Sequence, residues 1–269
     1  MSGKLTLLGT GSSAGDPRLG NNWGACDPKN PKNRRRRCAA LIERISGRGR
    51  TRALIDASPD LREQLLDAEI DTLDGVLFTH DHADHTHGID DLRMLAYNAK
   101  RRVDVHFDIA TRASLLERFR YCFESPPGSM YPPILNGHVI DPPNAVRIDG
   151  AAGPIEAIPV VQAHGDAFSL GFRIADVAYS PDISGLSAEG QEQLRGLDLW
   201  IVDALRYIPH PSHFTVKQAL EWIEILKPKR AILTHLHVDL DYVTLKRELP
   251  AHVEPAYDGM SIHFDWAAA

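Results

Sequence analysis

The residues best suited to chemistry in this sequence form one short stretch, Thr79-His80-Asp81-His82-Ala83-Asp84-His85. It directly follows the apolar run 76–78, so we expect it at the end of a buried strand. Imidazole nitrogen and carboxylate oxygen are preferred ligands of borderline divalent metals. Residues two apart in an extended segment point the same way, so His80 and His82 can hold one ion together. The alternative is a histidine-rich surface turn without a ligand.

The same feature recurs later in the chain, where apolar runs end in further potential ligands. Residues 155–161 lead to His164, residues 177–179 lead to Asp182, and residues 230–233 lead to His235. Strand ends that gather along one edge of a sheet make a rigid platform for a site. These three residues and the histidine-rich stretch therefore predict one metal centre assembled from distant parts of the chain.

The seven donors suit two ions better than one. The ligands would be His80, His82 and His164 for the first ion, Asp84, His85 and His235 for the second, and Asp182 for both. Two ions roughly 3.5–4 Å apart turn a shared hydroxide into a nucleophile and clamp a phosphoryl group for in-line attack. We expect two divalent ions, Zn²⁺ or Mn²⁺; the same ligand types also suit iron.

Composition predicts an ordinary globular protein. The chain has 269 residues, of which 43% are hydrophobic and 25% charged. No repeat or low-complexity linker divides it, so we expect one domain over residues 1–269. There are 30 Lys and Arg against 36 Asp and Glu, a net charge of −6. That balance argues against a general nucleic-acid binder, which would usually be basic.

The cysteines and the N-terminus indicate a cytoplasmic, soluble protein that does not contact membranes. The three cysteines, Cys26, Cys38 and Cys122, contain no Cys-x-x-Cys pair, which argues against a disulfide framework. The first residues show no signal-peptide pattern. No apolar run approaches the ~20 residues that a membrane span needs.

The hydrophobic pattern predicts alternating strands and helices around these donors. Ser58 resembles an N-cap, with Pro59 as the first residue of a helix. The proline-rich residues 125–144 are expected to be a surface excursion. The other expected strands are 4–8, 38–42, 53–55, 74–79, 103–109, 170–174 and 199–202, and the other helices 89–95, 111–123 and 216–226.

A run of arginines precedes the second strand, in Asn33-Arg34-Arg35-Arg36-Arg37. Guanidinium groups match phosphate oxygens, so we take Arg34, Arg35, Arg36 and Arg37 as candidate substrate-binding residues. Alternate side chains of an extended segment face opposite sides, so only some of them would reach a site. A solvated basic edge is the alternative.

Two further residues are candidates for orienting metal ligands rather than binding the metal. Asp56 follows the strand 53–55 and could hold a metal-binding histidine by its second ring nitrogen, or cap a turn. His237 lies two residues after His235 and is assigned to the same supporting layer.

The metal motif resembles that of the metallo-β-lactamase superfamily. Residues 33–37, 55–60, 87–93 and 239–242 are similar to segments of the PhnP-like phosphodiesterases. The resemblance implies an α/β fold, an αββα sandwich of two mixed β-sheets flanked by helices. It also implies hydrolysis of small cyclic or nucleotide-like phosphodiesters, of the 5-phosphoribosyl 1,2-cyclic phosphate type, by a metal-bridging hydroxide.

The resemblance also suggests residues that move protons. The family uses a histidine that is not a metal ligand as a proton donor, and the matching position here is His213. An imidazole with a pKa near neutral suits this role, although a capping or surface histidine is the alternative. Asp84 is a second catalytic candidate besides being a ligand. PhnP-like proteins have a cysteine-rich structural zinc site, but here only Cys26 remains and Val238 replaces a later histidine, so we expect no structural zinc.

Other functions of the same fold stay open. A tRNA 3′-processing nuclease would need a basic arm, and none is evident. A thioesterase-like or lactam hydrolase would not need the arginines. A non-catalytic accessory protein of a biosynthetic pathway, similar to coenzyme PQQ synthesis protein B, would keep the metal without turnover. We expect a small phosphorylated substrate as the partner and no stable nucleic-acid complex; a homodimer is compatible with the resemblance.

Overall fold

The computed structural model describes residues 1–266, which divide into two compact units. Unit 1 contains residues 1–8, 39–156 and 261–266, and unit 2 contains residues 9–38 and 157–260. Each unit holds one β-sheet core and its helices. The single domain over residues 1–269 stays a prediction.

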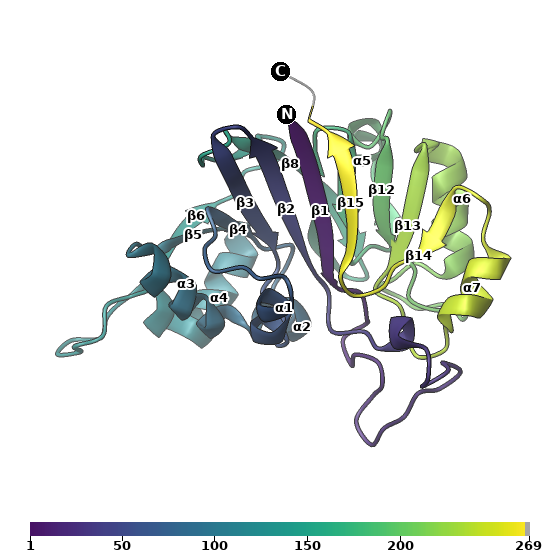
Figure 1. Ribbon diagram of the computed structural model, residues 1–269, viewed down its shortest axis with the longest axis horizontal. Coiled ribbons are helices and arrows are strands. Elements are labelled where there is room, and N and C mark those ends of the chain that lie inside the picture. Colours follow the sequence, from purple (N-terminus) through teal and green to yellow (C-terminus); the bar gives the residue numbers. More distant parts are fainter. Residues whose placement is uncertain (267–269) are drawn as a thin grey trace. The chain divides into compact units, whose positions relative to one another are not determined.

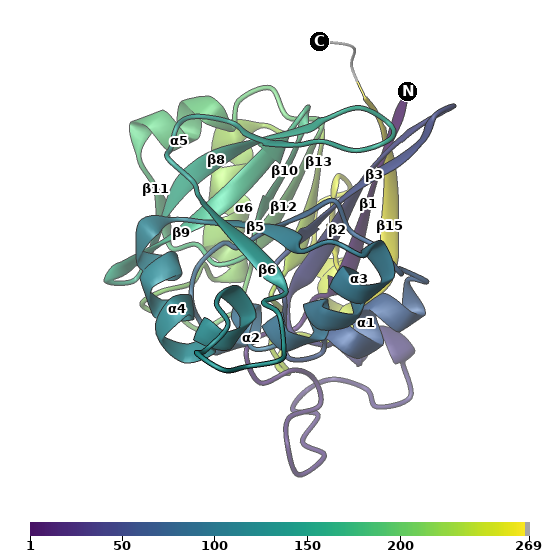
Figure 2. The same cartoon turned by 90° about the vertical axis from the view of Figure 1, so that its left-hand side faces the viewer.

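Unit 1 is built on a seven-stranded mixed sheet (Figure 1). In spatial order its strands are β15 (Met260–Asp265), β1 (Ser2–Gly9), β2 (Ala39–Ser46), β3 (Gly49–Ile55), β4 (Gly75–Leu77), β5 (Val103–Phe107) and β6 (Leu135–Val139). Strands β2 and β3 are antiparallel, whereas β3, β4, β5 and β6 run parallel. Figure 2 shows β5 and β6 side by side.

The parallel register positions the residues that follow β3 and β4. Ile55 lies opposite Leu77, so both strands end at the same edge of the sheet. Asp56 donates its backbone N–H to the Leu77 carbonyl at 2.9 Å. All three residues of β4 are buried, which fixes this central strand in the core. The histidine-rich stretch therefore begins beside Asp56.

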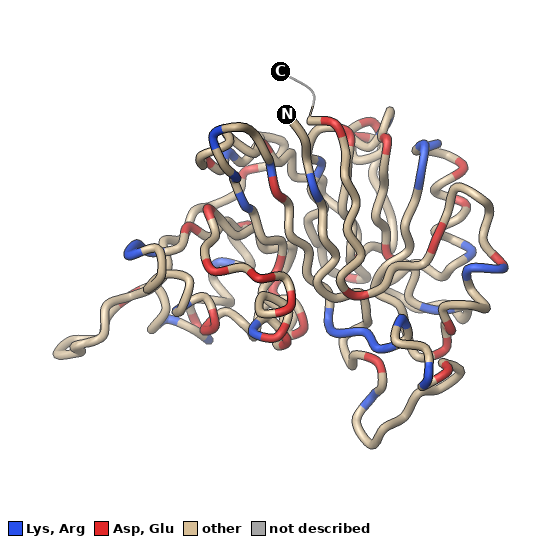
Figure 3. The backbone as a smooth tube through the Cα atoms, in the orientation of Figure 1, with Lys and Arg blue, Asp and Glu red and all other residues tan. Residues whose placement is uncertain are grey.

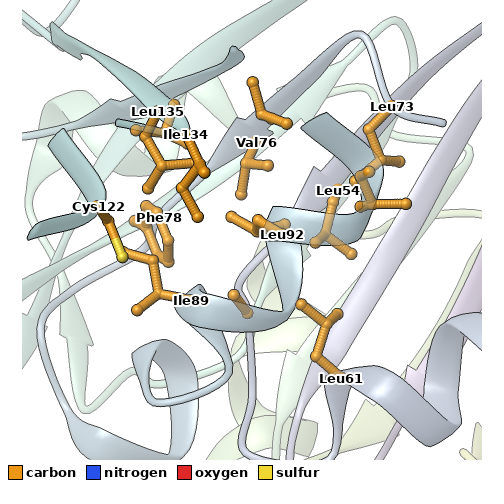
Figure 4. Packing of buried hydrophobic residues seen from close by; sticks show 14 of the residues in the cluster. Leu54, Leu61, Leu73, Val76, Phe78, Ile89, Leu92, Cys122, Ile134 and Leu135 are labelled. Carbon is orange, nitrogen blue, oxygen red and sulfur yellow. The ribbon is translucent and has the colours of Figure 1, made fainter. Parts of the chain in front are cut away.

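Helices cover the apolar side chains of this sheet. They are α1 (Leu61–Asp67), α2 (Ala83–Thr86), α3 (Leu92–Ala99) and α4 (Ile109–Phe123), with a short 3₁₀ helix at Ile89–Asp91 before α3. Leu61 and Leu92 pack in one buried cluster with Leu54, Val76 and Phe78 of the sheet (Figure 4). This packing holds the strand that delivers the metal-binding stretch.

Unit 2 is built on the second mixed sheet. Its strands are, in spatial order, β11 (Gly185–Leu186), β8 (Ile155–His164), β9 (Ala167–Ile174), β10 (Val177–Ser180), β12 (Leu199–Asp203), β13 (Arg230–Thr234) and β14 (Val253–Pro255). The short strand β7 (Val146–Ile148) lies among the residues of unit 1. Strands β8, β9 and β10 form an antiparallel meander. Strands β10, β12, β13 and β14 run parallel, so their carboxyl ends share one edge.

The helices of unit 2 are α5 (Ala188–Gln193), α6 (Val216–Leu226) and α7 (Tyr242–Glu248). Helix α6 starts at a capping box, in which Thr215 and Gln218 satisfy each other's backbone N–H groups. It ends at Lys227, whose φ of 51° is left-handed. Ala219 and Ile223 of α6 pack against Trp200 and Leu233 of the sheet. Among residues 1–266, no helix is both long and apolar enough to cross a bilayer.

The predicted fold class of two mixed β-sheets with flanking helices is confirmed, with local corrections. The expected surface excursion at 125–144 contains the strand β6. Its side chains do not alternate between buried and exposed, because most of them are exposed to solvent, so the sequence pattern did not reveal the strand. Helix α1 begins at Leu61 with Asp60 as its N-cap, not at Pro59. The Ser58 hydroxyl instead accepts the Asp60 N–H and bonds to Gln64.

We predict that Leu61→Ala lowers the free energy of unfolding by about 2–5 kcal/mol, because it leaves a cavity in the unit 1 core. Leu61 is fully buried, whereas Leu66 on the same helix is 57% exposed. The matched control Leu66→Ala should change that free energy by less than about 0.5 kcal/mol. Urea unfolding followed by circular dichroism measures both; equal destabilisation would contradict the packing described for α1.

Candidate metal centre

Unit 1 contributes four of the predicted donors, His80, His82, Asp84 and His85. The rings of His82 and His85 each lie 4.4 Å from that of His80, measured between centroids. Helix α2 begins directly after His82, which places Asp84 and His85 in its single turn. The Oδ2 atom of Asp84 lies 3.4 Å from Nε2 of His85. The local change from strand to helix therefore gathers all four side chains.

Asp56 organises these histidines from the end of β3. Its side chain is fully buried and accepts the Nδ1–H of His85 at 2.7 Å. It also accepts the Thr79 hydroxyl at 2.9 Å, and Thr79 Oγ1 lies 2.9 Å from Nδ1 of His80. Burial raises the pKa of the Asp56 carboxyl, and His85 and Thr79 oppose that rise. This network directs Nε2 of both histidines to act as ligand atoms.

Unit 2 contributes His164, Asp182 and His235 from the ends of three strands. The Oδ2 atom of Asp182 lies 3.6 Å from Nε2 of His164, and its Oδ1 atom lies 3.5 Å from Nε2 of His235. His164 donates its Nδ1–H to the Ser212 carbonyl at 2.7 Å. The two oxygens of one carboxylate thus face two different imidazoles, which is the arrangement that a bridging ligand requires.

His213 joins this set through a carboxylate that sequence reasoning missed as a functional residue. Its Nδ1–H donates to Oδ2 of the fully buried Asp203 at 2.7 Å, and its Nε2 lies 3.8 Å from Oδ2 of Asp182. Its ring stacks on that of His235 with centroids 4.7 Å apart. Asp182, His213 and His235 offer ligand atoms within 4.8 Å of one another, so this trio could also hold an ion.

Asp203 could have been found from its place in the sequence. It is the last residue of the apolar strand 199–203, and it lies opposite Thr234 in β13, one residue before His235. A carboxylate that ends a buried strand is the same signal that singled out Asp56. Burial raises the pKa of the Asp203 carboxyl well above its usual value, while His235 opposes that rise.

One donor, His235, and the supporting residue Asp56 have left-handed backbone conformations. Asp56 has a φ of 65° and His235 a φ of 57°, and each follows directly after a strand. Residues other than glycine adopt this conformation at a cost of roughly 1–3 kcal/mol when the surrounding structure demands it. The strain lies at the two positions where the chain must turn a functional side chain away from the strand direction.

The four candidate arginines differ widely in their surroundings. Arg35 is 1% exposed and bonds to Oδ2 of Asp16 at 2.8 Å and to the Leu240 carbonyl at 2.7 Å. The backbone N–H of Arg36 donates to Asp258 at 2.7 Å, and its side chain pairs with the same carboxylate. Arg34 is exposed and Arg37 is half-buried. Figure 3 shows this run in blue; its phosphate-binding role stays a prediction.

His237 lies in a cationic environment of unit 2. It is 8% exposed, its Nδ1 lies 2.9 Å from Oδ2 of Asp239, and its Nε2 accepts a hydrogen bond from Arg18. Burial lowers the pKa of His237, and the nearby Arg18 and Arg206 lower it further. The described contacts of His237 are therefore with charged residues rather than with the predicted ligands.

Comparison with known proteins identifies the class. The family model described as "Beta-lactamase superfamily domain" matches residues 51–236, so the chain belongs to this superfamily, and it is a PhnP-like, metallo-β-lactamase-type member. A crystal structure of "a New Diphosphatase from the PhnP Family" superimposes with a TM-score of 0.88 at 34% identity, covering 98% of both chains. The Bacillus subtilis protein YhfI shares the fold, with a TM-score of 0.70 at 17% identity over 98% of this chain and 100% of that one.

A curated relative has a different name. The "Octanoyltransferase" of Porphyromonas gingivalis is 34% identical over 267 residues, which are 97% of this chain but 52% of that protein. This chain therefore spans about half the length of that relative. Family membership and the His and Asp donors together support a metal-dependent hydrolase that binds divalent ions.

We predict that Arg35→Met lowers the free energy of unfolding by about 3–5 kcal/mol, because it leaves the buried Asp16 carboxylate without its partner. The control Arg34→Met, on an exposed side chain, should stay within about 0.5 kcal/mol of wild type. Chemical denaturation measures both variants. If they unfolded alike, the Arg35–Asp16 pair would not be what stabilises this loop.

Proposed function

We propose that this protein is a dinuclear, divalent-metal-dependent hydrolase of small phosphodiesters. The observation that supports this most directly is the Asp182 carboxylate, whose two oxygens lie 3.6 and 3.5 Å from the Nε2 atoms of two different histidines. A single carboxylate between two imidazoles suits a bridge between two ions. The superfamily match and the PhnP-family relative support the class of reaction.

The ligand assignment rests on the sequence motif and on the family. We propose His80, His82 and His164 for one ion, Asp84, His85 and His235 for the other, and Asp182 for both. The donors are nitrogen and oxygen atoms, and Nδ1 of His80, His85 and His164 already bonds to a protein oxygen. When bound, Zn²⁺ or Mn²⁺ would supply the Lewis acidity that neutralises charge on a phosphoryl group.

His213 supplies the proton that the leaving group needs. Asp203 accepts the Nδ1–H of His213, so the transferable proton sits on Nε2, the atom that faces Asp182. A buried carboxylate stabilises the imidazolium before transfer and fixes the orientation of the ring. Leaving-group oxygen would receive this proton as the P–O bond breaks. Asp84, proposed as a ligand, contributes to catalysis only by holding its ion in this scheme.

The substrate is a small anionic molecule in this proposal. The similar structure is titled a diphosphatase, which suggests a phosphoric anhydride or diester as the bond that is cleaved. The name of the curated relative favours a second candidate, hydrolysis or transfer of an acyl thioester, although this chain spans only about half of that protein. We also propose a cytoplasmic location and a small phosphorylated partner rather than nucleic acid.

The test is turnover on bis(p-nitrophenyl) phosphate, on a cyclic ribose phosphate and on an octanoyl thioester, with metal content determined on the same sample. Zn²⁺ and Mn²⁺ are supplied separately. Turnover of the phosphodiesters that scales with two bound ions supports the proposal. Cleavage of the thioester alone would replace it with the acyl candidate, and two ions without any turnover would favour an accessory role.

We predict that Asp182→Ala loses both ions, because the carboxylate is shared between them. Elemental analysis of the purified variant should give less than about a tenth of the wild-type metal content, consistent with the tenfold or larger losses that follow removal of even supporting groups. Glu189→Ala, on an exposed residue of α5, is the matched control and should keep its metal. Near-normal metal content in the Asp182 variant would refute the bridging assignment.

We predict that His213→Ala keeps both ions and lowers kcat by about 10²–10⁴-fold, the usual contribution of a positioned proton donor. Elemental analysis and steady-state kinetics on one preparation measure both effects. Loss of metal together with activity would make His213 a ligand, as the trio with Asp182 and His235 allows. An unchanged kcat would move the proton-donor role to another residue.

A further inference from the structure

We propose that Arg18 and Arg206, which both lie near His237, bind a non-reacting phosphate group of the substrate. This inference rests on the proposed function and refines it, because it assigns the residues that select among phosphodiesters. All of the residues involved belong to unit 2. None of the four arginines at 34–37 is required for it.

Arg18 is positioned by His237. The residue is half-buried, and its guanidinium donates to Nε2 of His237, while Nδ1 of the same ring lies 2.9 Å from Oδ2 of Asp239. The backbone of Arg18 pairs with Asn22 in both directions, at 2.9 and 3.1 Å, in a narrow hairpin. The imidazole and the hairpin together hold the guanidinium in one place before any ligand binds.

Arg206 is positioned by its own loop. Its Nε donates to the Ile208 carbonyl and its NH2 group to the Pro209 carbonyl, both at 3.0 Å. Its backbone carbonyl accepts the Val216 N–H at 3.1 Å, where α6 begins. Arg206 is close enough to His237 and His210 to lower the pKa of each ring, although burial is the larger cause for both.

Backbone hydrogen bonds bring these segments together at the carboxyl edge of the unit 2 sheet. Ala204 donates to the Thr234 carbonyl at 3.0 Å, and His237 donates to the Leu205 carbonyl at 3.1 Å. Ser12, in the segment that leads to Arg18, donates to the Leu236 carbonyl at 3.1 Å. The main chain itself therefore places both arginines next to His237, two residues from the proposed ligand His235.

Neither guanidinium is neutralised by a protein carboxylate. Among the described residues, no Asp or Glu oxygen lies within ion-pair distance of Arg18 or Arg206, whereas Arg35 and Arg36 both pair with carboxylates. Arg18 is close enough to Asp16 to lower the pKa of that carboxyl, but Asp16 forms its ion pair with Arg35, and Asp239 lies 2.9 Å from Nδ1 of His237. Two positioned, uncompensated guanidinium groups favour an anion with several oxygens, such as a phosphate.

The bound group should be a different one from the phosphate that is cleaved, but close enough to belong to the same substrate. The Cα atoms of His235 and His237 are two steps apart along the chain, at most about 7.6 Å. Arg18 contacts the His237 ring and Arg206 follows Leu205, which bonds to the His237 backbone, whereas His235 and His213 lie near Asp182. A substrate that carries one phosphate at the reacting centre and a second one nearby would use both places.

The experiment compares two substrates that differ by this group alone, 5-phosphoribosyl 1,2-cyclic phosphate and ribose 1,2-cyclic phosphate. Arg18→Met and Arg206→Met should each lower kcat/KM at least tenfold for the first, mainly through KM, and less than twofold for the second. For the first substrate, kcat/KM of Arg18→Lys should fall between the values of the wild type and Arg18→Met, because lysine keeps the positive charge but not the forked geometry of the guanidinium. Arg48→Met, in the exposed turn between β2 and β3, is the control for loss of one charge.

A binding measurement keeps this inference separate from the proposed function. Calorimetry gives the Kd of ribose 5-phosphate, which carries only the non-reacting group, for the metal-loaded protein. The double variant Arg18→Met/Arg206→Met should bind at least tenfold more weakly than wild type, even if neither cyclic phosphate is turned over. Equal Kd values, or equal losses of kcat/KM on both substrates, would overturn the assignment. Absence of turnover in the wild type would refute the function alone.

Discussion

Two buried carboxylates hold imidazoles on which the proposed chemistry of this protein depends. Asp56 follows β3 in unit 1 and Asp203 ends β12 in unit 2, and both side chains are fully buried. Each accepts the Nδ1–H of one histidine at 2.7 Å, His85 in the first case and His213 in the second. Burial raises the pKa of both carboxyls; His85 opposes that rise at Asp56, and His235 opposes it at Asp203. Each unit thus fixes one imidazole by the same physical device.

The sheets position these carboxylates, because parallel strands end at a common edge. In unit 1 the register of β3 with β4 brings Asp56 beside the start of the histidine-rich stretch. In unit 2 the register of β12 with β13 brings Asp203 opposite Thr234, next to His235. The neighbouring apolar residues are buried in packed clusters, so a rigid core fixes the positions of the side chains at the strand ends. The left-handed backbone at Asp56 and His235 is strain that this packing can support.

The segment 9–38 shows how one residue type serves different physical roles. Arg35 is an internal cross-link, since its guanidinium bonds to Asp16, Asn33 and the Leu240 carbonyl. Arg18, in the same segment, forms no ion pair with a carboxylate of the described residues, and its guanidinium donates a hydrogen bond to His237 instead. In a protein with a net charge of −6, a positioned guanidinium provides a local site of positive charge for an anionic substrate.

The sequence by itself determined the elements and the kinds of ligand. Apolar runs of strand length that end in His or Asp are local patterns, and they predicted the strands and the His and Asp donors; the resemblance of this motif to the metallo-β-lactamase superfamily implied two mixed sheets with flanking helices. Helix α6 was predicted with its observed bounds because its apolar spacing and its Thr215 cap are local as well. The ligand assignment itself remains a prediction.

Only the tertiary structure decided the partner of each polar group. Asp203 was not assigned a role because its contact with His213 depends on how the segment after β12 folds back, where Leu205 donates to the Phe214 carbonyl. Arg35 could not be separated from Arg36 because its partner Asp16 lies 19 residues away. Such contacts depend on register and burial across the chain, which spacing along the sequence does not encode.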